Sequence, residues 1–333
     1  MSTCATASRD LNEPLTGTAA TAKTWLLLEQ PGPWGAKALT SSHLDPELGA
    51  ALEAAAEGTG VRVALIRRPG RHADCHTVTR RRVFVAHVDP GRMGSEHTDA
   101  GHTPAATWLR TAVTDHPEQL LQLDFAGLGR GDHAGFDAVL DGRPHTGAPL
   151  ALVCTNGKRD RCCALLGRPL AAELADAGEE GAWEVTHLGG HRFSPTLLVL
   201  PYGYAYGRVD AHAVKDVLAA VRDDRIVTEG CRGNSAWERP GQAAELAVRS
   251  ATGEDRAGTL SVVLVAAGHT ESGHMGADTT PVWEVTVTHV DGRRWQVTVA
   301  QGASLPPRPE SCGAALASPP RMDVVAVSEA TGA

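Results

Sequence analysis

Short apolar runs of strand length alternate with amphipathic stretches along the first part of the chain. The run at residues 24–30 (TWLLLEQ) is continuous, apolar and of strand length, and residues 61–70 and 82–89 are predicted to form a second and a third strand. Between the first two, Asp45 and Pro46 begin a stretch with leucines and alanines at helical spacing, so we expect a helix with an aspartate N-cap there.

The pattern continues with a predicted helix near residues 105–113 and a predicted strand near residues 120–124. Alternating elements of this kind favour a sheet covered by helices. The first part of the chain therefore predicts an N-terminal α/β domain.

A second set of elements begins with an apolar strand that ends at Cys154. A helix, three short strands and another helix follow, the last beginning at Asp210 as its N-cap. The order β–α–β–β–β–α is close to a thioredoxin-like arrangement. This fold carries its redox chemistry where the first strand meets the first helix, and the first strand here ends at Cys154.

Residues beyond about 255 alternate apolar and polar positions on both sides of Asp291-Gly292, a dipeptide that strongly indicates a β-hairpin. The predicted class is α/β, with a small C-terminal β appendage and an N-terminal domain that could be a degenerate thioredoxin-like unit. The predicted divisions are a disordered tail at 1–22, an N-terminal α/β domain at 23–145, a thioredoxin-like domain at 146–254 and an extension at 255–333.

Composition narrows the classes of function. The chain has 333 residues, 42% hydrophobic content and a formal charge of −8, so we expect a globular protein that binds neither nucleic acid nor an anionic membrane. No apolar run reaches the roughly 18–20 residues that span a bilayer, and the N-terminus lacks a secretory signal. We expect a cytoplasmic protein, and its oligomeric state is not readable.

Cysteines and histidines supply the candidate chemistry. Cys154, Cys162 and Cys163 lie at a strand-to-helix junction, with three basic residues in the loop between them. Positive charge and a helix N-terminus both lower the pKa of thiols, and thiolate is the ligand form. Spacing alone leaves Cys162 and Cys163 both open as the second ligand, and we favour Cys163. Cys4 is expected to be an exposed thiol, and Cys312 a structural residue.

His187 and His191 flank two glycines, which favour a turn that aims both imidazoles at one point. Two cysteines with two histidines are the ligand set of a Rieske-type [2Fe–2S] centre, and also of a structural zinc site. From the residues alone the two alternatives are near parity.

The segments CTNGKRDRCC, THLGGHRFSPTLLVLPYGYAYGR and RGNSAWERPGQAAELAVR resemble the sucrase/ferredoxin-like family of thioredoxin-like [2Fe–2S] proteins, and the resemblance covers roughly residues 24–320. It implies cluster ligands in the pattern C-x8-C followed by H-x3-H, which falls on Cys154, Cys163, His187 and His191. Relatives usually carry histidine where Asn156 stands. The "sucrase" label implies sucrose hydrolysis, but no pair of carboxylates in a recognisable site supports it.

We therefore predict an electron-transfer protein with a [2Fe–2S] cluster, a redox carrier more than an enzyme with its own substrate. The alternatives are a structural zinc protein, and a thiol oxidoreductase or hydrolase with a vestigial cluster site. No G-x-G-x-x-G fingerprint follows a strand, so we predict no flavin or nicotinamide cofactor. Electrons would pass to and from an unidentified donor or acceptor protein.

Overall fold

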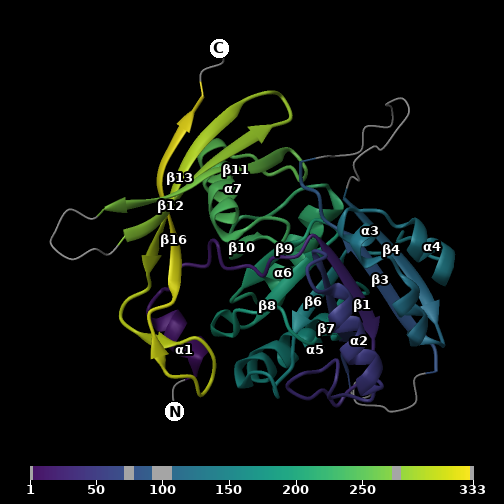
Figure 1. Cartoon of the computed structure of the whole chain (residues 1–333). Helices are drawn as coiled ribbons and strands as arrows, with labels where there is room; N and C mark the ends of the chain where they lie inside the picture. Colours follow the sequence, from purple (N-terminus) through teal and green to yellow (C-terminus); the bar gives the residue numbers. More distant parts are fainter. Residues whose placement is uncertain (1–2, 71–78, 92–106, 272–278, 331–333) are drawn as a thin grey trace, which may run out of the picture.

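The computed structural model describes residues 3–70, 79–91, 107–271 and 279–330. These residues contain both helices and sheets, in agreement with the predicted α/β class (Figure 1). The thioredoxin-like arrangement stays a prediction.

A ten-stranded sheet forms the centre of the molecule, in the order β10-β9-β8-β6-β7-β2-β1-β3-β4-β5. Its two halves meet where β2 pairs antiparallel with β7, at Ile66 with Val185 and Arg67 with Glu184. Strands of the two predicted domains thus share one sheet, and the division into domains stays a prediction. The strands are β1 Thr24–Glu29, β2 Val61–Arg67, β3 Arg81–His87, β4 Trp108–Thr114, β5 Arg143–Pro144, β6 Leu150–Cys154, β7 Ala182–Val185, β8 Thr196–Leu200, β9 Tyr204–Gly207 and β10 Cys231–Asn234.

The helices that pack around this sheet begin as the sequence indicates. Asp45 caps the first of them by accepting a hydrogen bond from the Glu47 N–H (2.8 Å), and Asp210 accepts one from the Ala213 N–H (2.8 Å). Both predicted N-caps are confirmed. The helices are α2 Pro46–Ala56, α3 Phe125–Gly129, α4 Ala134–Leu140, α5 Arg168–Asp176, α6 Ala211–Arg222 and α7 Arg239–Thr252.

Two predicted elements in the N-terminal half are wrong. The described part of the expected helix at 105–113 belongs to strand β4, which pairs antiparallel along β3 from Trp108–His87 to Thr114–Arg81. The expected strand at 120–124 overlaps a 3₁₀ helix, η1 Pro117–Gln122, that Pro117 begins. Pairing with a neighbouring strand outweighs the local helical pattern in the first case.

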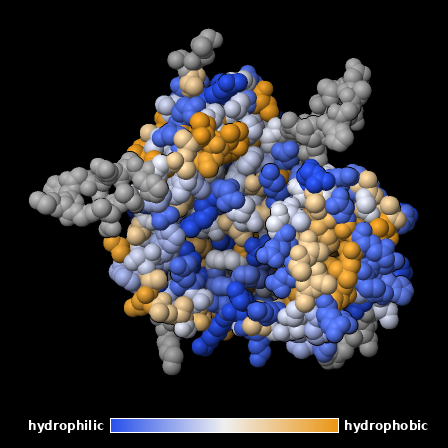
Figure 2. Space-filling view, in the orientation of Figure 1, coloured by the Kyte–Doolittle hydropathy of each residue, from blue (hydrophilic) through white to orange (hydrophobic). Residues whose placement is uncertain are grey.

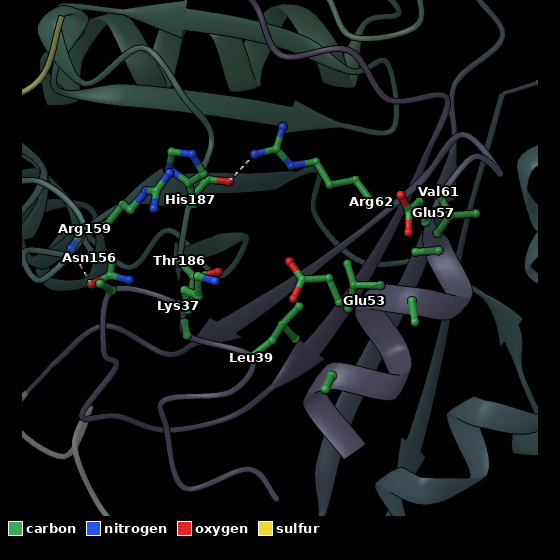
Figure 3. Close-up of a pocket in the computed structure, with 16 residues that line it drawn as sticks. Lys37, Leu39, Glu53, Glu57, Val61, Arg62, Asn156, Arg159, Thr186 and His187 are labelled. Carbon is green, nitrogen blue, oxygen red and sulfur yellow. Dashed lines mark hydrogen bonds between the residues drawn. The ribbon is translucent and has the colours of Figure 1, made fainter. Parts of the chain in front are cut away.

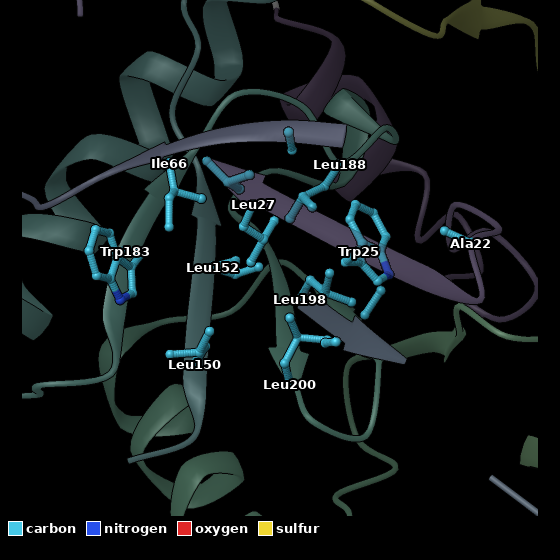
Figure 4. Packing of buried hydrophobic residues seen from close by; sticks show 14 of the residues in the cluster. Ala22, Trp25, Leu27, Ile66, Leu150, Leu152, Trp183, Leu188, Leu198 and Leu200 are labelled. Atoms are coloured by element: carbon cyan, nitrogen blue, oxygen red, sulfur yellow. The ribbon is translucent and has the colours of Figure 1, made fainter. Parts of the chain in front are cut away.

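A buried apolar cluster lies on the sheet where the two halves join. It includes Trp25 and Leu27 of β1, Leu152 of β6 and Leu198 of β8, whose side chains Figure 4 shows close together. Cys154 and Cys163 belong to the same cluster. The two cysteines are therefore part of the buried core of the sheet.

A four-stranded antiparallel sheet of β11 Leu260–Glu271, β12 Thr279–His289, β13 Arg294–Ala303 and β16 Pro320–Glu329 follows α7. Strands β12 and β13 form the predicted hairpin around Asp291-Gly292, and Gly292 has the positive φ of 95° that the turn requires. Helix α7 packs against one face of this sheet, whereas side chains such as Val263 and Val265 are exposed. Figure 2 shows apolar side chains near the top of the view, over this sheet.

The N-terminal segment differs from the predicted disordered tail. It forms helix α1 Cys4–Asp10, capped by Thr3, and lies beside the C-terminal segment (Figure 1). Beyond the helix, Glu13 is buried and accepts a hydrogen bond from Arg192 (2.8 Å). The predicted exposed thiol, Cys4, is only 1% exposed. Composition missed this order because the contacts that fix the segment come from distant parts of the chain.

Candidate metal centre

Cys154 and Cys163 come together because two backbone segments approach closely. Cys154 ends the buried strand β6, and Cys163 begins the π-helical turn η2 Cys163–Gly167 that leads into α5. At the end of that turn, a Cβ on Gly167 would stand 2.2 Å from the backbone oxygen of Cys154. Only glycine permits this contact, and it leaves the two sulfur atoms 3.5 Å apart.

The two thiols share one hydrogen bond and are both buried. The hydrogen bond with Cys163 lowers the pKa of the Cys154 thiol well below its usual range, and the proximity of His187 lowers it further, against the opposing effect of burial. The same hydrogen bond raises the pKa of Cys163. One sulfur of the pair is thus set up as a thiolate, the form that binds metal.

The histidines reach the same place from the loop after β7. Gly189 and Gly190 have φ of 73° and 69°, a left-handed pair that reverses the chain between the two imidazoles. The rings of His187 and His191 stack with centroids 4.9 Å apart, and the Nδ1 of His191 is 3.2 Å from the sulfur of Cys163. His191 also begins a short 3₁₀ turn, η3 His191–Phe193.

His187 carries a polar atom that nothing in the described residues satisfies. Its Nδ1 is buried and has no hydrogen-bond partner among them. A buried donor or acceptor without a partner costs free energy, and such an atom in a native site calls for a ligand or ion. The Nδ1 atom of His187 and the two sulfur atoms therefore form a set of donors that is chemically suited to a metal.

The structure therefore brings all four predicted ligands into one neighbourhood. Cys162, the alternative second cysteine, lies elsewhere: its sulfur is 3.4 Å from that of Cys4. Of the two adjacent cysteines, Cys163 is the one that faces Cys154.

Two arginines that the sequence did not single out support the histidine loop. The Nη2 of Arg62 donates to the backbone oxygen of His187 (3.1 Å), and the Nη1 of Arg232 donates to that of Gly189 (3.1 Å). Burial lowers the pKa of Arg232 to about 9, while the charge of Cys154 opposes this shift, so Arg232 remains a cation at neutral pH. Their only signal in the sequence is that Arg62 stands in a predicted strand and Arg232 in the segment RGNSAWERP.

A cavity of about 800 Å³ opens beside the histidine side of the site. Figure 3 shows Asn156, Arg159 and His187 on one side of this cavity and Glu53 of α2 across from them, while the side chain of Arg62 extends toward His187. Asn156 joins the cysteine loop to Gly35, because its Nδ2 donates to the backbone oxygen of that residue (2.9 Å). The histidines are partly exposed, whereas the cysteines are buried.

Fold and site together define an α/β protein with a cluster of cysteine, histidine and aspartate side chains that could bind a metal, among them Asp160, Cys163 and His191. Residues 15–233 match the sucrase/ferredoxin-like family, and the chain belongs to that family. No curated protein and no solved structure matches the chain. Among the described residues, no helix is long and apolar enough to cross a membrane.

Proposed function

We propose that this protein transfers electrons through a [2Fe–2S] cluster bound by Cys154, Cys163, His187 and His191. The observation that carries the proposal is the convergence of two buried sulfurs, 3.5 Å apart, with two stacked imidazoles, one of which has a buried nitrogen without a partner. Family membership supports the same cofactor through the matching pattern of cysteines and histidines.

The surrounding charges suit a cluster with two thiolate ligands. When bound, a [2Fe–2S] cluster accepts and releases one electron, and two histidine ligands give it a higher potential than four cysteines would. Arg62 and Arg232 both feel the charge of Cys154, and they hold the loop that carries the histidines. These cations favour negative charge at the site, and the burial of the two cysteines excludes water from their sulfurs.

The proposed ligands differ in exposure, so one side of the site is more accessible to a partner protein than the other. His187 lines the cavity and His191 is partly exposed, so the histidine side is the one that a partner can approach. Lys37 and Arg159 line the same cavity and add positive charge beside His187. We propose that the unidentified electron donor or acceptor protein docks over this cavity with an acidic surface.

The experiment is the absorption and electron paramagnetic resonance of the purified protein. We expect a coloured protein whose visible absorbance bleaches with dithionite and whose reduced form gives a Rieske-like signal. His187→Cys and His191→Cys should each shift this signal, because a thiolate replaces an imidazole on iron. His212→Cys, on the exposed surface of α6, is the matched control and should leave the spectra unchanged. Spectra that do not respond to either ligand variant contradict the histidine assignment.

One distance favours a second candidate, a structural zinc ion. Cys163 Sγ and His191 Nδ1 are only 3.2 Å apart, which is close enough for both to bind one ion. Zinc takes cysteine and histidine in tetrahedral sites of this composition. A colourless protein that loses zinc in both Cys163→Ser and His191→Ala would establish this candidate in place of the cluster.

A further inference from the structure

A second group of cysteines lies outside the site described above. Cys4 begins α1, Cys162 precedes η2, and Cys312 lies between the short strands β14 Arg308–Pro309 and β15 Leu316–Ala317. Their sulfurs form a nearly equilateral triangle, with separations of 3.4 Å for Cys4–Cys162, 3.6 Å for Cys4–Cys312 and 3.3 Å for Cys162–Cys312. Three segments far apart in the sequence thus deliver one thiol each to the same point.

The separations suit a single ion. Thiolates bound to zinc at about 2.3 Å in a tetrahedral site are about 3.8 Å apart, slightly more than the separations seen here. A disulfide would need a separation of about 2.05 Å, and joining one pair would leave the third thiol over. An iron–sulfur cluster would spread three cysteines over different irons. The triangle is therefore closest to the face of a mononuclear metal site.

Asp160 supplies a fourth donor. Its two carboxylate oxygens each lie 3.9 Å from the sulfur of Cys4. The same oxygens accept hydrogen bonds from the backbone N–H groups of Cys162 and Cys312, both at 2.8 Å. Ligand atoms from all four residues lie within 4.8 Å of one another, and Asp160 is 3% exposed. Backbone hydrogen bonds of this kind orient a ligating carboxylate.

The site therefore has four candidate ligands, together with the backbone hydrogen bonds that orient its carboxylate.

We propose that Cys4, Cys162, Cys312 and Asp160 bind one zinc ion, in addition to the metal of the Cys154–His191 centre, which this site adjoins at Asp160. Three thiolates select a soft or borderline metal, and the carboxylate favours zinc over a copper(I) ion. Binding forms three Zn–S bonds and one Zn–O bond, and each thiol that is protonated beforehand releases its proton. No electron is transferred.

The ion would join the N-terminal helix and the C-terminal extension to the cysteine loop. The backbone oxygen of Asp160 accepts a hydrogen bond from the N–H of Cys163 (3.2 Å), so the same loop that holds this zinc also positions a ligand of the first centre. The ion is thus a structural clamp for the two terminal segments, beside the first centre.

The test measures zinc, iron and visible absorbance on the same samples of full-length protein. We expect Cys4→Ser and Cys312→Ser each to lose one equivalent of zinc relative to the unaltered protein, while iron and absorbance remain. Cys231→Ala, a buried free cysteine outside the triangle, is the matched control and should keep the full zinc content. Equal zinc in Cys4→Ser and the unaltered protein overturns the proposal.

Two measurements on the unaltered protein cover the case in which these variants do not fold. After removal of metal with a chelator, ZnCl₂ should raise the midpoint of thermal unfolding and MgCl₂ should not. The intact mass under non-reducing conditions should equal that of the fully reduced chain, because each disulfide would remove two hydrogen atoms. A disulfide among the three cysteines, or no response to zinc, overturns the proposal. If the unaltered protein contains no iron, but Cys4→Ser still loses one equivalent of zinc, the proposed cluster is refuted and the proposed zinc site is supported.

Discussion

Replacing Gly167 with alanine should empty the Cys154–Cys163 site while leaving the protein folded. A Cβ at residue 167 would stand 2.2 Å from the backbone oxygen of Cys154, whereas ordinary van der Waals contact begins at 3.4 Å. The turn η2 and strand β6 must therefore separate by the difference, about 1.2 Å, because neither partner is a side chain that can rotate away. Metal–ligand distances tolerate only about 0.2 Å, so the displacement is several times what a metal site accepts.

The cost in stability should be smaller than the cost in metal binding. Overpacking in a buried region costs about 1–3 kcal/mol, and the gain in helix propensity from glycine to alanine offsets up to about 1 kcal/mol of that. Urea unfolding gives the free energy of unfolding, while metal content and visible absorbance per chain give site occupancy. We expect Gly167→Ala to lose most of the bound metal and roughly 1–2 kcal/mol of stability.

Gly135→Ala is the control for this prediction. Gly135 lies in α4, is exposed, and a Cβ there would have its nearest neighbour at 4.0 Å. It should keep the metal and gain about 0.5–1 kcal/mol. If Gly167→Ala instead binds metal as the unaltered protein does, with unchanged stability, the close contact is not what positions the cysteines.

Two further predictions concern buried charge. His87 is 5% exposed, its Nδ1 lies 2.9 Å from the hydroxyl of Thr24, and burial lowers its pKa from 6.5 to about 4. Between pH 6.5 and 4 the imidazole of His87 is therefore protonated in the unfolded chain and neutral in the folded chain. The free energy of unfolding should fall by up to about 3 kcal/mol as the pH decreases through this range. Urea unfolding of His87→Gln should lack this part of the pH dependence. Glu245 and Arg249 form a fully buried ion pair (3.0 Å), and Glu245→Ala should cost about 3–5 kcal/mol by urea unfolding because it leaves Arg249 unpaired. Exposed Glu229→Ala is its control and should change stability by less than about 0.5 kcal/mol.

The sequence by itself determined the local features of this protein. Asp45 and Asp210 act as N-caps, and Asp291-Gly292 forms the hairpin, because each depends on hydrogen bonds and dihedral angles within a few residues. The sequence also identified Cys154, Cys163, His187 and His191 as candidate ligands, because that choice depends on their spacing and on the family pattern.

Tertiary structure decided what depends on contacts distant in the chain. Strand β4 exists because β3 pairs with it, and Cys163 rather than Cys162 faces Cys154 because the turn η2 packs against β6. Cys4 and Cys312 stand 308 positions apart, so no local pattern could place them beside Cys162. The physical reason is that spacing and propensity report only neighbours along the chain, whereas the close approach of two backbones is set by packing of the whole core.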